Sequence, residues 1–444
     1  MPADFAGTGP FMMIVVNVRS KTEGRVGVEG RAVALGLATV VAGAGVAGCT
    51  GDADTMPIGA EAVTLAVSPA QGTQRPRPDT PIAVQARQGT IENVTVATRN
   101  ERVEGAFNAD RTQWRSRWSL RPDTEYRVAA TALGRDGRTR TVTSRFTTAK
   151  ADKTVGVTLE GPYDKEEVGV GMPIVMKFDR EVKDRAAVER AMELRSSKPV
   201  EGAWHWFDGE TLVFRTKQFW PRHTDVVFRA HLSGVAVAKG VYGGKDHTVR
   251  FRVGDERIST ASEDKHQMVV KKNGRVVRKM PISMGKGGVR KYTTTNGMHL
   301  TMDKGNPVTM TSSWEGIGPG SPGYYSLSVN HAVRISNSGE YVHSAPWSVG
   351  SQGNSNVSHG CINTSPSHAR WFYDFSKRGD PFEVTGTSRE LEPDNGWGYW
   401  QMKWQDWVKG SALKQTLRIG PQGAAAVPLQ HTAPGAVAGS QQHP

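Results

Sequence analysis

The segment Thr124-Glu125-Tyr126-Arg127-Val128 opens a run in which apolar and polar residues alternate, and this run closes at Arg145-Phe146. The turn signal Arg135-Asp136-Gly137 divides it into two halves. Alternation over short runs that are bounded by turns is typical of half-buried β-strands. The stretch therefore predicts short β-strands separated by a turn.

This pattern belongs to a diverged repeat that covers the first half of the chain. Three pairs of segments recur at separations of 92, 100 and 105 positions: Pro81-Ile82-Ala83-Val84 with Pro173-Ile174-Val175-Met176, Thr124-Glu125-Tyr126 with Thr224-Asp225-Val226, and Arg145-Phe146 with Arg250-Phe251. Short strands in units of about 100 residues are typical of immunoglobulin-like sandwiches. We expect two such domains, at residues 63–149 and 150–254.

From Asp255 onward, glycines and serines separate short strands through Val384. Asn273-Gly274 lies between two apolar runs and predicts a tight hairpin. One helix is expected from Ser365 to Lys377, with Ser365 as the N-cap and Pro366 at the first helical position. The fold class is therefore mostly β: two immunoglobulin-like sandwiches followed by a third β domain, at residues 255–386, with a short helix.

A Trp-rich extension, residues 387–410, follows this domain. Trp397, Trp400, Trp404 and Trp407 fall on one face of a predicted helix, and such a stripe favours packing against a neighbouring domain over binding of sugar rings. The tail, residues 411–444, is rich in Ala, Gly, Pro and Gln, and we expect it to be disordered.

The N-terminal region, residues 1–48, resembles a secretory signal. Basic residues precede the apolar run 32–47, which is shorter than a comfortable membrane span and ends in Val46-Ala47-Gly48-Cys49. That string resembles a bacterial lipobox, so Cys49 is the expected lipidation site, with residues 49–62 as a linker. A plain signal peptide or an uncleaved anchor, with Cys49 incidental, is the alternative. If Cys49 is lipidated, Cys361 is the one free thiol of a secreted chain.

The chain carries a formal net charge of +13 and attracts polyanions. No basic helix or stacking motif concentrates the Lys and Arg residues, so nucleic acid is not the expected partner. A diffuse basic surface fits an anionic cell wall as well.

The residues suited to catalysis lie in two neighbouring strings, Tyr341-Val342-His343-Ser344-Ala345-Pro346-Trp347 and Ser358-His359-Gly360-Cys361-Ile362-Asn363-Thr364. His343 precedes Cys361 by 18 positions. A thiol becomes a nucleophile when a base takes its proton, and imidazole suits that task near neutral pH. Gly360 allows the backbone to expose N–H groups toward a developing oxyanion.

Other chemistries are less consistent with these strings. A structural zinc site usually needs four ligands at paired spacing, which is missing, so we expect no metal and no cofactor. In papain-type proteases the cysteine precedes the histidine. A serine nucleophile at Ser358 would need a G-x-S-x-G elbow. His359 is expected to be structural rather than a second base.

The string Ser358–Asn363, with His343 upstream, resembles the motif of the L,D-transpeptidases, and the domain order resembles their actinobacterial branch. The resemblance covers about Val63 to Val408. It implies an enzyme whose cysteine attacks the stem tetrapeptide of peptidoglycan, releases D-alanine and passes the acyl group to a diaminopimelate amine, leaving a 3→3 cross-link. It also implies stem peptides as substrates, carbapenems as inhibitors, and a lipid-anchored protein on the outer face of the cell membrane.

Site residues carried over from the resemblance fall into two groups. The catalytic group is Cys361 as nucleophile, His343 as base, the backbone carbonyl of Ser344 as its orienting group, and N–H groups around His359, Gly360 and Cys361 as the oxyanion hole. The substrate-binding group is Tyr325, Met310, Ser358, Asn363 and Trp347, with Met310 on a lid whose Gly/Pro-rich part, residues 312–326, also holds Trp314.

Two other functions stay open at this point. An L,D-carboxypeptidase would use the same cysteine but let water resolve the thioester. A non-catalytic wall-binding protein would use only the sandwich domains, and the intact pair His343 and Cys361 argues against it.

Overall fold

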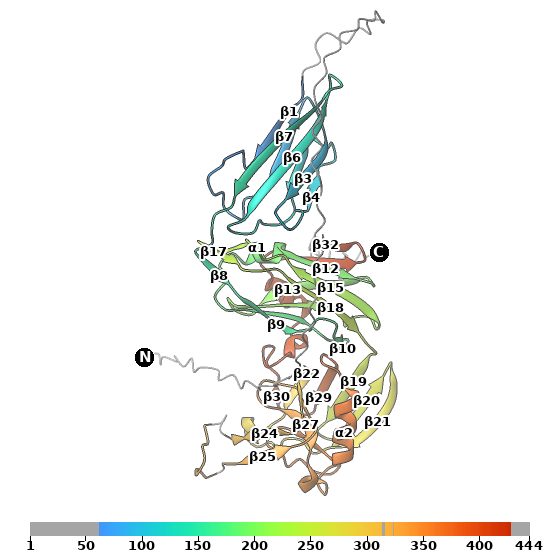
Figure 1. Cartoon of the computed structure of the whole chain (residues 1–444). Coiled ribbons are helices and arrows are strands. Elements are labelled where there is room, and N and C mark those ends of the chain that lie inside the picture. Colours follow the sequence, from blue (N-terminus) through green and yellow to red (C-terminus); the bar gives the residue numbers. More distant parts are fainter. Residues whose placement is uncertain (1–61, 313–315, 323, 428–444) are drawn as a thin grey trace, which may run out of the picture. The chain divides into compact units, whose positions relative to one another are not determined.

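The computed structural model describes residues 62–312, 316–322 and 324–427, and Figure 1 shows its elements. Cys49 and Trp314 lie outside the described residues. Within them, no helix is both long and apolar enough to cross a bilayer. The described chain is mostly β, as the sequence predicts.

The first domain is a sandwich of two antiparallel sheets, ordered β1-β2-β5-β4 and β3-β6-β7. Its inward residues, including Trp114, Tyr126 and Phe146, form a separate apolar core. The strands are β1 (Thr64–Ser68), β2 (Ala83–Arg87), β3 (Gly89–Ala97), β4 (Gly105–Phe107), β5 (Gln113–Ser116), β6 (Glu125–Gly134) and β7 (Thr139–Thr147).

The second domain has one sheet ordered β10-β18-β15-β12 and one ordered β32-β31-β13-β14-β11-β9, with a small sheet β16-β17-β8 beside them. Its elements are β8 (Lys153–Val155), β9 (Val157–Gly161), β10 (Glu167–Val168), β11 (Ile174–Phe178), α1 (Arg185–Arg190), β12 (Met192–Ser196), β13 (Val200–Trp206), β14 (Thr211–Thr216), β15 (Thr224–Ala230), β16 (Ala236–Ala238), β17 (Val241–Gly243) and β18 (His247–Val253). The helix α1 was not predicted.

The predicted repeat is visible in the strand pairing. In the first domain Tyr126 pairs with Phe146 across β6 and β7, and in the second Val226 pairs with Phe251 across β15 and β18. The same sequence pattern therefore makes the same antiparallel ladder twice.

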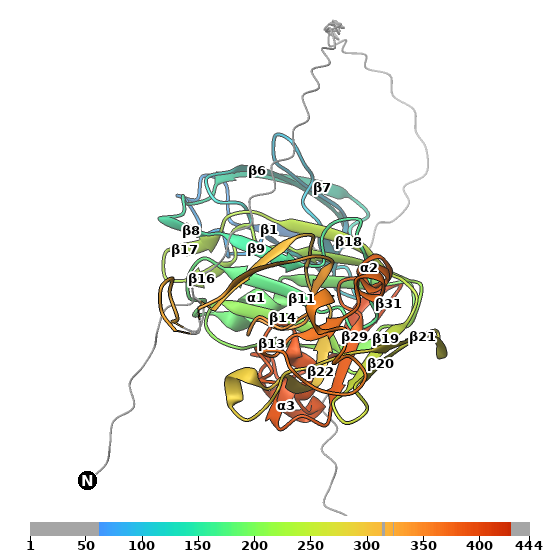
Figure 2. The ribbon, with the colours of Figure 1, turned by 90° about the horizontal axis from the view of Figure 1, so that it is seen from below.

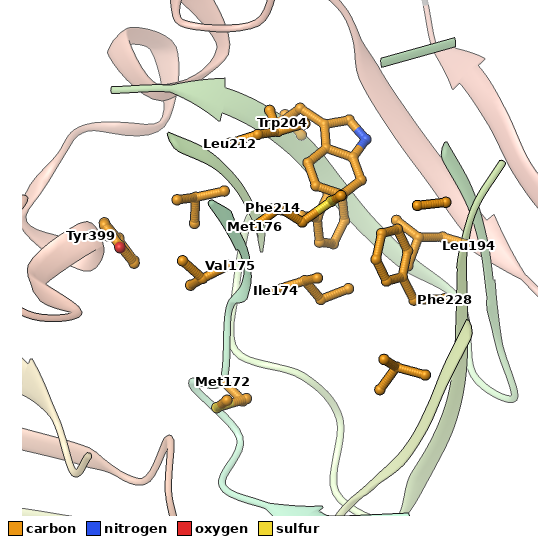
Figure 3. Close-up of a cluster of buried hydrophobic side chains, with 14 of the residues drawn as sticks. Met172, Ile174, Val175, Met176, Leu194, Trp204, Leu212, Phe214, Phe228 and Tyr399 are labelled. Carbon is orange, nitrogen blue, oxygen red and sulfur yellow. The ribbon is translucent and has the colours of Figure 1, made fainter. Parts of the chain in front are cut away.

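The strand β11 is buried on both faces, unlike its counterpart β2, in which burial alternates. Ile174 and Met176 point to the sandwich interior, near Phe214, whereas Val175 points toward Tyr399 of the C-terminal extension (Figure 3). The extension thus covers the outer face of β11 as a third layer. Because both faces of β11 are buried, its residues do not alternate between apolar and polar as those of β2 do.

The C-terminal extension differs from its prediction in two ways. The four Trp residues do not share one helix, because extended backbone at Met402 and Lys403 separates η4 (Gly398–Gln401) from α3 (Trp404–Lys409). The Met402 carbonyl there accepts a hydrogen bond from Arg215 Nη2 at 2.9 Å. The predicted disorder from residue 411 is also wrong for part of the tail, since β31 (Thr416–Gly420) and β32 (Gly423–Val427) add to the edge of β13.

The packing role predicted for the Trp stripe is confirmed. Trp407 is fully buried, and its Nε1 donates to Ala203 O of β13 at 3.0 Å. The Arg215 guanidinium lies over the rings of Trp400, Trp404 and Trp407, at 4.6–5.3 Å from their centroids. Burial lowers the pKa of Arg215 to about 10, yet it stays charged at neutral pH and the aromatic faces stabilise that charge.

The third domain is built on a six-stranded sheet ordered β21-β20-β19-β29-β22-β30, with β29 between β19 and β22 (Figure 2). A four-stranded sheet, β23-β26-β27-β28, and the hairpin β24-β25 complete it. The predicted hairpin and helix are both present: Asn273 and Gly274 have positive φ between β20 and β21, and α2 begins at Pro366 after the N-cap Ser365.

The bounds of this domain's elements are β19 (Arg257–Ser262), β20 (Gln267–Lys272), β21 (Arg275–Pro281), η1 (Arg290–Tyr292), β22 (Thr295–Leu300), β23 (Lys304–Gly305), β24 (Val308–Thr311), β25 (Ser326–Val329), β26 (Ala332–Arg334), β27 (Tyr341–Ser344), η3 (Pro346–Ser348), β28 (Ile362–Thr364), α2 (Pro366–Phe375), β29 (Pro381–Thr385) and β30 (Arg389–Glu390).

Glu189 of α1 fastens the C-terminal extension to the second domain. Its buried carboxylate accepts hydrogen bonds from Trp206 Nε1, Ser411 Oγ, and the backbone N–H groups of Ala412 and Leu413, at 2.6–3.2 Å. We expect Glu189→Ala to lower the free energy of unfolding by about 3–5 kcal/mol, because it leaves these donors buried without an acceptor.

The measurement is thermal and denaturant unfolding of the variant beside Glu210→Ala, which removes an exposed carboxylate from the same domain. Equal stability of the two variants would mean that Glu189 does not hold the extension.

Candidate active site

The two catalytic strings become neighbouring parallel strands. In the register of β27 and β28, Val342 pairs with Ile362 and His343 with Asn363. Because side chains alternate along a strand, His343 and Asn363 project on the same face as Cys361, which lies just before β28. The fold thus brings the base and the thiol together across one strand pair.

The histidine is held in the tautomer that a base needs. His343 is buried, and its Nδ1 lies 3.0 Å from the carbonyl oxygen of Ser344. A carbonyl only accepts, so Nδ1 carries the hydrogen and Nε2 keeps a free lone pair. Burial lowers the pKa of His343, so the imidazole is neutral at pH 7. The predicted role of the Ser344 carbonyl in orienting the ring is therefore matched by the geometry.

The thiol rests in its protonated form. Cys361 Sγ lies 3.5 Å from Gly339 O, which can accept its hydrogen, and 4.0 Å from Met310 Sδ. Burial raises the pKa of Cys361 to about 12; the backbone N–H of Tyr341 lowers it and the charge of Glu340 raises it further. The resting pair is therefore a thiol and a neutral imidazole, and the proton moves when the substrate is in place.

The loop around the cysteine is braced by Ser358. Its hydroxyl donates to Cys361 O at 2.6 Å and accepts from the Gly360 N–H at 3.1 Å. Gly360 has a φ of +125°, a conformation that side chains disfavour. The Gly360 N–H is thus engaged in this arrangement, which differs from its predicted place in the oxyanion hole.

The hairpin of β24 and β25 holds Met310, the residue predicted to lie on a lid. Met310 lies on β24 beside the thiol. At the loop end of the hairpin, Ser312 N–H donates to Tyr325 O and the Ser312 hydroxyl accepts from Tyr325 N–H. Tyr325 stacks on the ring of His359 at 5.4 Å, and Tyr292 meets that ring edge-on at 4.8 Å. His359 is thus held between two aromatic rings, as a structural residue would be.

The remaining predicted residues flank the histidine. Asn363 Nδ2 donates to Ser348 Oγ at 3.1 Å and so ties β28 to η3. Trp347 on η3 is half exposed, with its ring 6.1 Å from that of His343. The supporting role of Asn363 and the substrate-contacting role of Trp347 stay predictions.

Sequence reasoning missed the strand β22 behind this site. Thr294 Oγ1 donates to Gly360 O at 2.8 Å, and Thr295 contacts the buried carboxylate of Glu340. The one available signal was the position of Glu340, three residues before His343. Among the described residues, no three or more His, Cys, Asp or Glu side chains cluster so as to hold a metal ion.

Comparisons with known proteins agree with this geometry. The family model of the L,D-transpeptidase catalytic domain matches residues 256–384, and that of a bacterial Ig domain matches residues 73–236. L,D-transpeptidase 2 of Mycobacterium tuberculosis is 38% identical over 75% of this chain and 81% of its own length. The chain belongs to the L,D-transpeptidase family.

Other L,D-transpeptidases show the same relationship. L,D-transpeptidase 5 of M. tuberculosis is 34% identical over 79% of this chain and 77% of its own length. Among solved structures, the LD transpeptidase LdtMt1 in complex with imipenem is 39% identical over 52% of this chain and 99% of its own, with a TM-score of 0.44. The family model and the two curated relatives make the chain an enzyme, a peptidoglycan transpeptidase.

The state of His343 gives a pH dependence. A base must be neutral to accept a proton, and burial lowers the pKa of His343 below the ordinary 6.5. The rate at which a stem-peptide donor is consumed should therefore be at its plateau at pH 7 and decrease on acidification, with a midpoint below pH 6.5. The measurement is kcat/KM against pH.

Ser344→Ala is the matched control, since it keeps the carbonyl that orients the ring and should preserve the profile. His343→Ala should lower kcat/KM about 10³-fold or more. A midpoint above pH 6.5 in the unaltered protein would contradict this account.

Proposed function

We propose that the enzyme forms 3→3 cross-links between peptidoglycan stems, with Cys361 as the nucleophile. The observation that supports this most is the arrangement of His343: its Nδ1 is fixed by Ser344 O, and its Nε2 lone pair is on the face from which Cys361 projects. That arrangement fits acyl transfer by a thiol and membership of the family.

The reaction has two halves. His343 Nε2 takes the thiol proton as sulfur attacks the carbonyl that precedes the terminal D-alanine of a tetrapeptide stem. The peptide C–N bond breaks, the imidazolium returns the proton to the leaving amine, and a thioester remains. A diaminopimelate amine of a second stem then attacks the thioester carbonyl and passes a proton to His343. The C–S bond breaks, and the imidazolium returns that proton to the sulfur, which restores the thiol and the neutral imidazole.

Backbone N–H groups of the loop that carries Cys361 would stabilise the oxyanion of each tetrahedral intermediate. Gly360 N–H is engaged by Ser358 Oγ, and the N–H of Cys361 is the candidate donor. Met310, in contact with the sulfur, would shield the thioester from water and so favour an amine acceptor. Carbapenems would acylate the same sulfur, because their strained β-lactam carbonyl can occupy the acyl position.

The protein would work on the outer face of the cell membrane, anchored by a lipid on Cys49, with the two sandwich domains as spacers. The lipobox-like string Val46-Ala47-Gly48-Cys49 and the apolar run before it support this proposal.

Replacement of the nucleophile tests the reaction. Cys361→Ala and Cys361→Ser should lower cross-linking about 10³-fold or more, because neither side chain can be ionised by His343 to a useful extent. The measurement is mass analysis of muropeptides after incubation with purified enzyme. Joined stems indicate transfer, and shortened monomers would indicate a carboxypeptidase instead. Cross-linking at the unaltered rate in Cys361→Ala would exclude the cysteine mechanism.

The anchor is tested by Cys49→Ala. We expect this variant to leave the membrane fraction, because two acyl chains stabilise attachment by about 0.8 kcal/mol per buried methylene. Cys361→Ala is the matched control and should remain in that fraction. Unchanged fractionation and mass of Cys49→Ala would favour an uncleaved anchor.

A further inference from the structure

A buried polar chain lies directly behind the nucleophile and has no part in the mechanism above. It consists of Glu340, Thr295 and His299, whose side chains are 3%, 0% and 0% exposed. Thr295 Oγ1 lies 2.6 Å from Glu340 Oε2 and 2.8 Å from His299 Nε2, so its hydroxyl connects the carboxyl group to the imidazole.

This chain fixes the backbone that touches the thiol. Glu340 lies between Gly339, whose carbonyl oxygen is 3.5 Å from Cys361 Sγ, and Tyr341, whose N–H faces the same sulfur. Its carboxyl group is held by Thr295 N–H at 2.7 Å and by the Thr295 hydroxyl. The position of the groups around the sulfur therefore depends on the Glu340 side chain.

Counting hydrogens shows that the chain needs an additional proton. His299 Nδ1 lies 3.0 Å from Gly297 O, an acceptor, so Nδ1 carries a hydrogen. In a neutral ring Nε2 would then be bare. The Thr295 hydroxyl has one hydrogen and could donate it either to His299 Nε2 or to Glu340 Oε2. The other of these two short contacts would then have no hydrogen between its atoms.

One extra proton satisfies every contact. It can lie on His299 Nε2, which then donates to Thr295 while Thr295 donates to Glu340. It can instead lie on Glu340, which donates to Thr295 while Thr295 donates to His299. Burial lowers the pKa of His299 more than the charge of Glu340 raises it. The two forms differ only in where the proton lies, and in both the buried unit has no net charge, as a site without water requires.

We propose that Glu340, Thr295 and His299 are positioning residues for the nucleophile: they share this proton, hold residues 339–341 against the Cys361 sulfur, and set by their charge how readily the thiol ionises. The inference rests on the proposed role of Cys361. Of the three residues, only Glu340 acts on Cys361 through its charge, and this charge raises the pKa of the thiol.

The other groups around the unit do not replace it. Ser338 Oγ donates to Glu340 Oε2 at 3.2 Å, and Asn395 Nδ2 in turn donates to Ser338 Oγ. On the neighbouring strand β30, Arg389 pairs in register with Thr295, but its guanidinium is 3.8 Å from Glu392. Among the described residues, the charge of Glu340 acts on His299 within the unit and on Cys361 outside it.

Two conservative variants change the charge at residue 340 in different ways: one removes it, and the other leaves it uncompensated. Glu340→Gln can donate to Thr295 Oγ1 and accept from Thr295 N–H, so it copies the neutral form and removes the carboxylate. His299→Gln can still donate to Thr295 but cannot hold the extra proton, so Glu340 stays charged without compensation.

The test is the rate at which iodoacetamide alkylates Cys361, followed by peptide mass analysis between pH 6 and 9. Only the thiolate reacts with iodoacetamide. A change of one unit in the pKa of the Cys361 thiol therefore changes the alkylation rate about tenfold. We expect Glu340→Gln to react up to about tenfold faster than the unaltered protein at each pH, and His299→Gln to react slower by a similar factor. Glu340→Ala, which releases residues 339–341, should react about 10- to 100-fold slower.

Glu390→Gln, an exposed carboxylate on β30, is the matched control and should not change the rate. Thermal unfolding of each variant separates a loss of fold from a change of reactivity. Rates that shift in the same direction in Glu340→Gln and His299→Gln, or in neither, would make the unit a structural brace only and overturn the proposal. Neither result bears on the transferase reaction, which Cys361→Ala tests separately.

Discussion

The parallel pairing of β27 with β28 is the constraint on which the site depends. It sets His343 opposite Asn363 and therefore brings the base and Cys361 to one face, although 18 residues separate them in the chain. A hydrogen bond from Asn363 to Ser348 ties β28 to the segment that follows β27. The Ser344 carbonyl fixes the His343 imidazole in the tautomer whose Nε2 can accept a proton. A shift of one residue would turn every side chain of the strand to the opposite face and separate the base from the thiol.

Burial gives this pair its chemical character. It lowers the pKa of the imidazole and raises that of the thiol, so the neutral pair is stable and the thiolate forms only when proton transfer accompanies attack. A buried, protonated thiol is protected against stray oxidation. The groups that then decide its reactivity are those within reach of the sulfur: Gly339 O, Tyr341 N–H, Met310 and the polar unit behind them.

The sequence predicted those features that depend on local pattern. Alternation and turn signals predicted the strands that hold Tyr126, Phe146, Val226 and Phe251, and the N-cap Ser365 predicted α2. The link between Glu340 and His299 could not be predicted, because they are 41 positions apart and are connected only through the hydroxyl of Thr295. The strand β31 was also missed, since its order comes from the free edge of β13 rather than from its own residues.

The central claim is that Cys361 is the acyl-accepting nucleophile activated by His343. Intact-mass measurement after incubation with a carbapenem tests it most directly. The account predicts a single mass increment, mapped to Cys361, absent in Cys361→Ala and formed much more slowly in His343→Ala. An increment on any other residue, or none from an enzyme that still forms cross-links, would contradict it.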